Sequence, residues 1–187
     1  MAESLAARGP FAGLHLPLAI GECSAAEFAP EAVFSVMPFR GRTAEVGAAL
    51  GMALPGPNAT AAAAGRRLLW TGKDAWLVLG PTGLADDLAR RLAGRAAVSD
   101  QSDSLAGLTL SGADARAVLA RLCPLDLDRG AFPDGATART DLAHIMGQVT
   151  RAGDASELMV PRSYAAHFLH EVEAAMRSVA AQRALRP

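Results

Sequence analysis

The stretch that decides the fold is RRLLWTGKDAWLVLGPTGLADDLARRLAG, residues 66–94. It opens with two apolar runs, Arg66–Trp70 and Ala75–Leu79, joined by the turn-rich segment Thr71–Asp74. A connection this short joins antiparallel strands, because a parallel crossover needs a dozen or more residues. The stretch therefore predicts a β-hairpin and argues against a doubly wound α/β fold.

The second half of the stretch predicts a helix over residues 84–92. Leucine recurs at every fourth position, two aspartates occupy the first turn and two arginines the last. Those charges complement the helix dipole, and Gly94 follows where a helix can end. A hairpin followed directly by an amphipathic helix is typical of an α+β fold.

The flanking sequence repeats this alternation of strands and helices. We expect strands at 33–39, 96–100, 105–110, 138–151 and 157–160, and helices at 46–54, 111–123 and around 168–179. Ser111 and Asp114 form a capping box that places the start of the second of these helices at Ser111, and Pro124 ends it at Cys123. The expected fold class is α+β, with a mixed, mostly antiparallel sheet and packed helices.

The domain organisation follows from length and composition. The chain has 187 residues, of which 51% are hydrophobic, which is enough for one sizeable core. We expect one α+β domain over residues 31–187. Residues 1–30 mix Gly, Pro and Ala without a period and predict an arm, either for docking or as a loose extension, and residues 55–65 predict a surface loop.

Charge and cysteine content exclude several function classes. The net charge is −1, from 18 basic and 19 acidic residues, so neither nucleic acid nor a membrane surface is an expected partner. No apolar run reaches the length of a membrane span, and the N-terminus lacks the pattern of a signal peptide. The two cysteines, Cys23 and Cys123, form no disulfide or zinc motif, and we expect a reducing cytoplasm.

A search for catalytic motifs finds no phosphate-binding glycine loop and no G-x-S-x-G elbow. His167 and His170 are three residues apart, and with His144 they offer three nitrogens to a metal, but no further ligand can be named. A helix-flank role fits them better. Cys123 follows a helix C-terminus, where the dipole disfavours a thiolate, so packing is its expected role. We expect no catalytic residue, no metal and no bound cofactor in this chain.

Two interpretations remain open for the aromatic and basic residues around the hairpins. Trp70 and Trp76 flank the first hairpin and either stack on a planar ligand or belong to the core. Arg139 and His144 are two further possible ligand contacts.

Several short motifs resemble those of a known family, the gamma subunit of heterotetrameric sarcosine oxidase. They occur between Val98 and Val172. The matching residues are Asp100, Gln101, Ser102 and Asp103 (DQSD); Cys123, Pro124, Leu125, Asp126 and Leu127 (CPLDL); Phe132, Pro133 and Gly135 (F-P-x-G); Thr140 and His144 before Ile145; and Arg162, Ser163 and Tyr164 (RSY).

The resemblance implies both a fold and a function. The implied fold is that of the folate-binding domain of aminomethyltransferase, the glycine-cleavage T protein. That fold relationship leaves open a stand-alone folate-binding or one-carbon (aminomethyl) transfer protein, whose candidate ligand contacts are Trp70, Trp76, Arg139 and His144. The implied function is that of a non-catalytic gamma subunit, partnered by alpha, beta and delta subunits. Such a complex oxidatively demethylates sarcosine to glycine with hydrogen peroxide and formaldehyde or methylenetetrahydrofolate. FAD, FMN, NAD, tetrahydrofolate and zinc are then expected in the other subunits.

Overall fold

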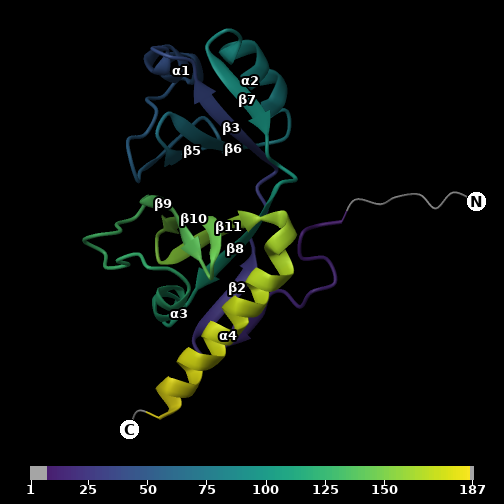
Figure 1. Cartoon of the computed structure of the whole chain (residues 1–187), viewed down its shortest axis with the longest axis vertical. Helices are drawn as coiled ribbons and strands as arrows, with labels where there is room; N and C mark the ends of the chain where they lie inside the picture. Colours follow the sequence, from purple (N-terminus) through teal and green to yellow (C-terminus); the bar gives the residue numbers. More distant parts are fainter. Residues whose placement is uncertain (1–7, 186–187) are drawn as a thin grey trace, which may run out of the picture.

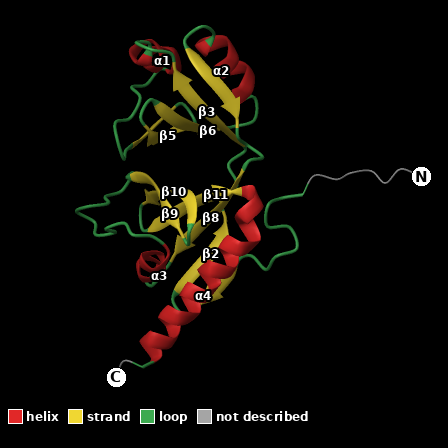
Figure 2. Ribbon diagram, in the orientation of Figure 1, coloured by secondary structure: helices red, strands yellow, loops and turns green. Residues whose placement is uncertain are grey.

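The computed structural model describes residues 8–185, which form two antiparallel β-sheets and four α-helices (Figure 1). The first seven residues of the predicted arm lie outside the described part. Figure 2 shows that each sheet carries its own pair of helices, so the molecule has two lobes. None of the helices in residues 8–185 is long and apolar enough to span a membrane.

The larger sheet has six strands in the order β1-β2-β8-β11-β10-β9. Every pairing in it is antiparallel. Helices α3 (Ala115–Leu122) and α4 (Ala165–Ala184) pack on one face of it. Its strands are β1 (Leu18–Ile20), β2 (Cys23–Glu27), β8 (Leu105–Ser111), β9 (Thr137–Leu142), β10 (Ile145–Ala152) and β11 (Ala155–Pro161).

The smaller sheet has five strands in the order β4-β5-β6-β3-β7, again all antiparallel. Helices α1 (Thr43–Leu50) and α2 (Leu84–Leu92) cover one face of it. Its strands are β3 (Ala32–Pro38), β4 (Thr60–Ala63), β5 (Arg66–Gly72), β6 (Ala75–Gly80) and β7 (Ala96–Asp100).

Strand alternation sends apolar side chains to both faces of the smaller sheet. Leu68 and Val78 belong to the cluster beneath α1 and α2. Their neighbours Leu69 and Leu79 point the other way and join Val33 and Met159 in a second cluster between the sheets. The layers therefore follow the order helices, sheet, sheet, helices.

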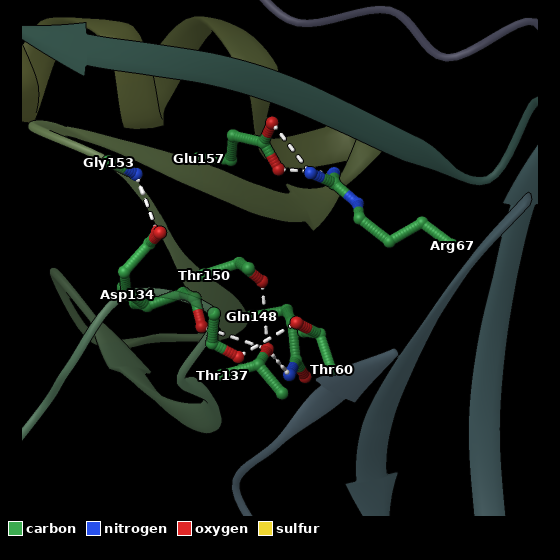
Figure 3. A network of polar contacts seen from close by, with 10 residues as sticks. Thr60, Arg67, Asp134, Thr137, Gln148, Thr150, Gly153 and Glu157 are labelled. Carbon is green, nitrogen blue, oxygen red and sulfur yellow. Dashed lines mark hydrogen bonds and ion pairs between the residues drawn. The ribbon is translucent and has the colours of Figure 1, made fainter. Parts of the chain in front are cut away.

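A buried polar network joins the two sheets beside that small apolar cluster (Figure 3). Gln148 on β10 donates its side-chain amide to the Trp70 carbonyl, 3.0 Å away on β5, and to the Thr137 hydroxyl at 2.6 Å. The Thr137 hydroxyl also lies 2.8 Å from that of Thr150. Nearby, the Gly135 carbonyl accepts hydrogen bonds from both the amide and the hydroxyl of Thr60.

An ion pair also connects the two sheets, and it is drawn in the upper part of Figure 3. Arg67 on β5 reaches both carboxylate oxygens of Glu157 on β11, one of them at 3.0 Å. The guanidinium also lies 5.5 Å from the ring centroid of Phe28. Strand β5 thus contacts β10 through the Trp70 carbonyl and β11 through the Arg67 side chain, and these contacts fix how the sheets face each other.

Most elements follow the sequence patterns. The antiparallel hairpin of β5 and β6 and the helix α2 are confirmed, as is the α+β class. The expected strand over 138–151 is instead a hairpin, because Ala143 and His144 both adopt positive φ and turn the chain between β9 and β10. One mostly antiparallel sheet was expected, and two fully antiparallel sheets are found.

Four expectations at element boundaries are wrong. Helix α1 ends at Leu50, where Gly51 adopts a φ of 75°, and does not reach residue 54. Helix α3 begins at Ala115, not at Ser111, because the Ser111 hydroxyl lies 2.9 Å from that of Ser24 and Arg183 binds Asp114 at 2.7 Å. Residues 60–63 are strand β4, not surface loop. Within the predicted arm, residues 18–27 form β1 and β2, and β2 pairs with β8.

A glycine allows the segment after β2 to cross β8. The Phe28 amide donates to the Gly107 carbonyl at 2.8 Å. A Cβ on Gly107 would overlap the Phe28 carbonyl oxygen and lie 2.9 Å from its ring carbon Cδ1. Only a residue without a side chain fits where the two backbones approach this closely.

We predict that Gly107→Ala lowers the free energy of unfolding by about 3 kcal/mol, because the added methyl group has no room in a packed interior. Gly72→Ala is the matched control. Gly72 also lies in a strand, and no atom stands within 4 Å of the place that an added Cβ would take, so a change under about 0.5 kcal/mol is expected. Urea denaturation followed by circular dichroism measures both, and equal midpoints would show that the crossing tolerates a side chain.

We further predict that Gln148→Leu costs about 1–3 kcal/mol, because the Trp70 carbonyl and the Thr137 hydroxyl lose their amide partner. Gln182→Leu on the exposed side of α4 is the control and should cost under about 0.5 kcal/mol. The same denaturation assay applies, and a neutral Gln148→Leu would contradict the structural role of the network.

Candidate functional site

The space between the two sheets is the candidate ligand site. A cavity of about 300 Å³ opens there, with apolar and polar side chains from both sheets around it. From the smaller sheet come Ser35, Thr71 and Leu77, and from the larger sheet Leu105, Arg139, Met146, Gly147, Gln148, Met159 and Pro161, with Gln101 from the connection between them.

Of the four candidate ligand residues, only Arg139 lines this cavity. Trp70 and Trp76 are paired across β5 and β6, and their neighbours Thr71 and Leu77 face the cavity, so the tryptophans alternate to the opposite face. Trp76 is buried there, and its indole nitrogen donates to the Pro55 carbonyl at 2.9 Å. The structure therefore does not bring the two indoles together with Arg139.

His144 has a turn role. It lies exposed between β9 and β10 with a φ of 66°, and its amide donates to the Asp141 carboxylate at 2.7 Å. Thr140 pairs with Gly147 across the same hairpin. His167 and His170 are exposed on α4. Within residues 8–185, no three His, Cys, Asp or Glu residues are grouped closely enough to hold a metal ion.

The DQSD motif forms the connection from β7 to β8, where the chain passes from the smaller sheet to the larger. The Ser102 hydroxyl and amide donate to Asp100 at 2.7 and 2.9 Å, and these bonds, the hydroxyl first, lower the pKa of the Asp100 carboxyl. Ser102 also accepts from the Val33 amide at 3.1 Å, and the Gln101 amide donates to the Val33 carbonyl at 2.8 Å. The motif thus joins this connection to the start of β3.

The RSY motif meets the DQSD motif in space, although about 60 residues separate them in the sequence. The Arg162 amide donates to the Ser104 carbonyl at 2.8 Å, and its guanidinium lies 3.8 Å from Asp103. Ser163 and Tyr164 follow in a single 3-10 turn that leads into α4, and both are exposed. The two motifs stabilise one crossing point between the sheets.

The CPLDL motif ends α3 and covers the larger core. Cys123 and Leu127 are buried in the cluster beneath α3 and α4, while Pro124 and Asp126 are exposed and Leu125 is half-buried. Burial raises the pKa of the Cys123 thiol, and the charge of Asp141 raises it further, against a lowering by the Leu125 amide. A thiol held protonated in this way is a poor nucleophile.

Cys23 is likewise no candidate nucleophile. It is buried on β2, and burial first, then the nearby charge of Asp114, raise the pKa of its thiol to about 11. At neutral pH both cysteines are therefore thiols that contribute to packing.

The F-P-x-G motif builds the loop before β9. Phe132 is buried in the larger core, and Pro133 is exposed. Gly135 adopts a φ of 76°, which favours glycine, and its carbonyl is the acceptor for Thr60 described above. This motif, too, holds the two sheets together.

Sequence reasoning missed the residues that join the sheets. Thr137, Gln148 and Thr150 are polar yet buried, and Arg67 and Glu157 meet across 90 positions. Polar residues within a strand normally predict a solvent-facing side, so their burial carries no local signal. Their partners are set by the packing of one sheet on the other.

Comparison with known proteins places these motifs in a family. A sequence model described as "Sarcosine oxidase, gamma subunit family" matches residues 37–177. The sarcosine oxidase subunit gamma of an Arthrobacter species is 35% identical over 159 residues, covering 82% of this chain and 78% of the relative. The protein of the same description from Corynebacterium sp. (strain P-1) is 33% identical over 161 residues, covering 83% and 79%.

Solved structures agree with the sequence comparison. A chain of the heterotetrameric sarcosine oxidase from Corynebacterium sp. U-96, in complex with pyrrole 2-carboxylate, superposes with a TM-score of 0.83 at 26% identity, covering 93% of this chain and 96% of that one. The glycine cleavage system aminomethyltransferase T from Bartonella henselae gives a TM-score of 0.63 at 16% identity, covering 90% of this chain and 53% of that one. The second likeness shows a shared fold alone.

The family match covers most of the chain and includes every motif described above, and the solved oxidase chain shares the fold over 93% of this chain. This chain therefore belongs to the sarcosine oxidase gamma subunit family.

Proposed function

We propose that this chain is the gamma subunit of a heterotetrameric sarcosine oxidase and contributes structure, not catalysis. The observation that carries the proposal is the full-length agreement with a chain of such an oxidase, at a TM-score of 0.83 over 93% of this chain. Its expected partners are the alpha, beta and delta subunits. The complex would oxidatively demethylate sarcosine to glycine, with hydrogen peroxide and formaldehyde or methylenetetrahydrofolate as the other products.

The roles of the family motifs support a structural subunit. DQSD, RSY and F-P-x-G place their polar groups on backbone atoms of neighbouring segments, and CPLDL contributes two buried side chains. The carboxylate of Asp100, the hydroxyl of Ser102 and the carbonyl of Gly135 have hydrogen-bond partners within the chain. Side chains engaged in this way stabilise shape and are not available to bind or activate a substrate.

The proposal assigns the cofactors to the other subunits. FAD, FMN, NAD, tetrahydrofolate and zinc would be held there, and the complex would work in the cytoplasm. Among residues 8–185, the lining of the cavity between the sheets includes one cation, Arg139, beside mostly apolar and amide side chains. The lining also includes the hydroxyls of Ser35 and Thr71, but within the described residues it has no His, Asp, Glu or Lys side chain that could activate either hydroxyl as a general base.

The alternative, a stand-alone folate-binding or one-carbon transfer protein, has Arg139 in the cavity as its remaining support. Three of its four candidate contacts, Trp70, Trp76 and His144, lie away from that cavity. The likeness to aminomethyltransferase T at 16% identity concerns the fold.

We predict that coexpression with the alpha, beta and delta chains yields one complex that contains this chain in equal proportion. Omitting it should reduce the yield of assembled oxidase about tenfold or more, since a subunit that covers apolar surface stabilises its partners by mass action. Size exclusion with densitometry measures the composition, and peroxide release from sarcosine measures activity. Assembly and activity that are unchanged without this chain would refute the proposal.

For the alternative, we predict that calorimetric titration of the isolated chain with tetrahydrofolate gives a Kd weaker than about 1 mM, because one exposed arginine supplies little affinity. The Arg139→Ala variant is the control and should give the same result. Binding tighter than about 10 μM that Arg139→Ala abolishes would favour a folate-binding protein instead.

A further inference from the structure

Two large apolar side chains stand together at the end of β3. Phe34 and Val36 of this strand pack beneath α1 and α2, so by alternation Met37 lies on the opposite face. The Phe39 amide donates to the Arg95 carbonyl at 2.8 Å, which continues the pairing beyond the strand. Phe39 is therefore on the same face as Met37.

That face of the smaller sheet is covered only in part. The larger sheet contacts it through the cluster that contains Val33, Leu69 and Leu79. Met37 and Phe39 lie outside this cluster and are 51% and 47% exposed. Single exposed apolar residues are ordinary, but two of this size on one bare sheet face beside the edge strand β7 indicate a contact surface.

The same corner carries a surplus of positive charge. Glu45 is shared by Arg42 at 2.7 Å and Arg95 at 3.7 Å, so one carboxylate faces two guanidinium groups. Arg40 is exposed and takes part in none of the ion pairs of residues 8–185. The nearby turn between β5 and β6 contains Lys73 and Asp74, whose opposite charges cancel each other. Three arginines against one glutamate leave two positive charges here, in a chain whose net charge is −1.

We propose, resting on the function proposed above, that this corner docks an acidic surface of another subunit of the oxidase. Carboxylates of that subunit would pair with the arginines, while an apolar side chain of it would cover Met37 and Phe39. We call the surface the β3 corner, formed by Met37, Phe39, Arg40, Arg42 and Arg95.

The composition of the β3 corner is that of a protein interface. Met, Phe and Arg are enriched at the centres of such interfaces, while Lys and Glu are depleted. A methionine adapts its shape to a partner, and a guanidinium binds a carboxylate through two parallel hydrogen bonds. Glu45 holds Arg42 and Arg95 in place without neutralising both, so they remain available to carboxylates.

Other macromolecules fit the β3 corner less well. Each basic residue raises affinity for an anionic membrane only about fivefold, so a surplus of two gives weak attachment. Proteins that bind nucleic acid through its backbone make on the order of six to ten phosphate contacts. Met37 and Phe39 would also contribute nothing to phosphate binding. An acidic protein surface, in contrast, could contact both the apolar pair and the arginines.

The apolar part is tested with the double variant Met37→Ser/Phe39→Ser. Coexpressed with tagged alpha, beta and delta chains, it should be retained about tenfold less than wild type after washing, while its isolated Tm stays within about 2 °C because both side chains are exposed. The matched control is Met146→Ser/Tyr164→Ser, which removes side chains 55% and 49% exposed at other places. The control should be retained like wild type.

The charged part is tested with Arg40→Glu against Arg129→Glu. Arg129 is 72% exposed and lies before β9 in the other lobe. Arg40→Glu should weaken retention about tenfold at low salt. Retention of this variant should also depend less on ionic strength than that of wild type, since salt screens the attraction between exposed charges. Arg129→Glu should change neither.

The outcomes separate this inference from the function on which it rests. If wild type is not retained at all, the proposed function fails. If wild type and all β3 corner variants are retained equally, or if the Met146/Tyr164 control alone is released, the docking surface lies elsewhere and the inference is overturned. A dimer of the isolated chain that Met37→Ser/Phe39→Ser dissolves would also overturn it, because the occupant would then be a second copy.

Discussion

The buried amide of Gln148 is the interaction on which the relation between the two sheets depends. It reaches the Trp70 carbonyl in one sheet and the Thr137 hydroxyl in the other. The apolar cluster between the sheets has only four buried members within residues 8–185 and would by itself allow them to slide. A different arrangement of the sheets would leave buried polar groups without hydrogen-bond partners, and each such group costs about 1–3 kcal/mol. The network therefore fixes one arrangement where apolar contact alone does not.

The family motifs extend this constraint to the places where the chain passes between the sheets. Ser102 joins the β7–β8 connection to Val33, and Arg162 joins it to the start of α4. Gly135 receives Thr60 from the other sheet. Motifs in an enzyme commonly converge on one cavity, whereas DQSD, RSY and F-P-x-G are spread along the junction of the two sheets and CPLDL lies in the larger core. Their distribution is what a subunit selected for its shape requires.

Patterns within one element were readable from sequence, and pairings between distant elements were not. The β5–β6 hairpin and α2 follow from spacing and charge placement that a short window contains. The capping box at Ser111 failed because Ser24 and Arg183, far away in sequence, compete for its two side chains. The sequence of β2 has no alternation of apolar and polar residues that would predict a strand. It forms a strand because its backbone pairs with β8. In the candidate site, spacing could not tell which sheet face the tryptophans occupy.

The smaller sheet is buried on its helix side but only in part on its other face. The residues that stabilise its fold therefore differ from those that we propose for subunit contact. The sheet's helix-side face and the part against Met159 are buried and supply stability, while about half of the surface of Met37 and Phe39 stays exposed in the isolated chain. An exposed apolar pair gains free energy only when something covers it. Because the β3 corner lies on the lobe away from α3 and α4, a partner bound there leaves the packing of the larger core unchanged. Substitutions at the corner can thus alter what the chain touches without altering how it folds.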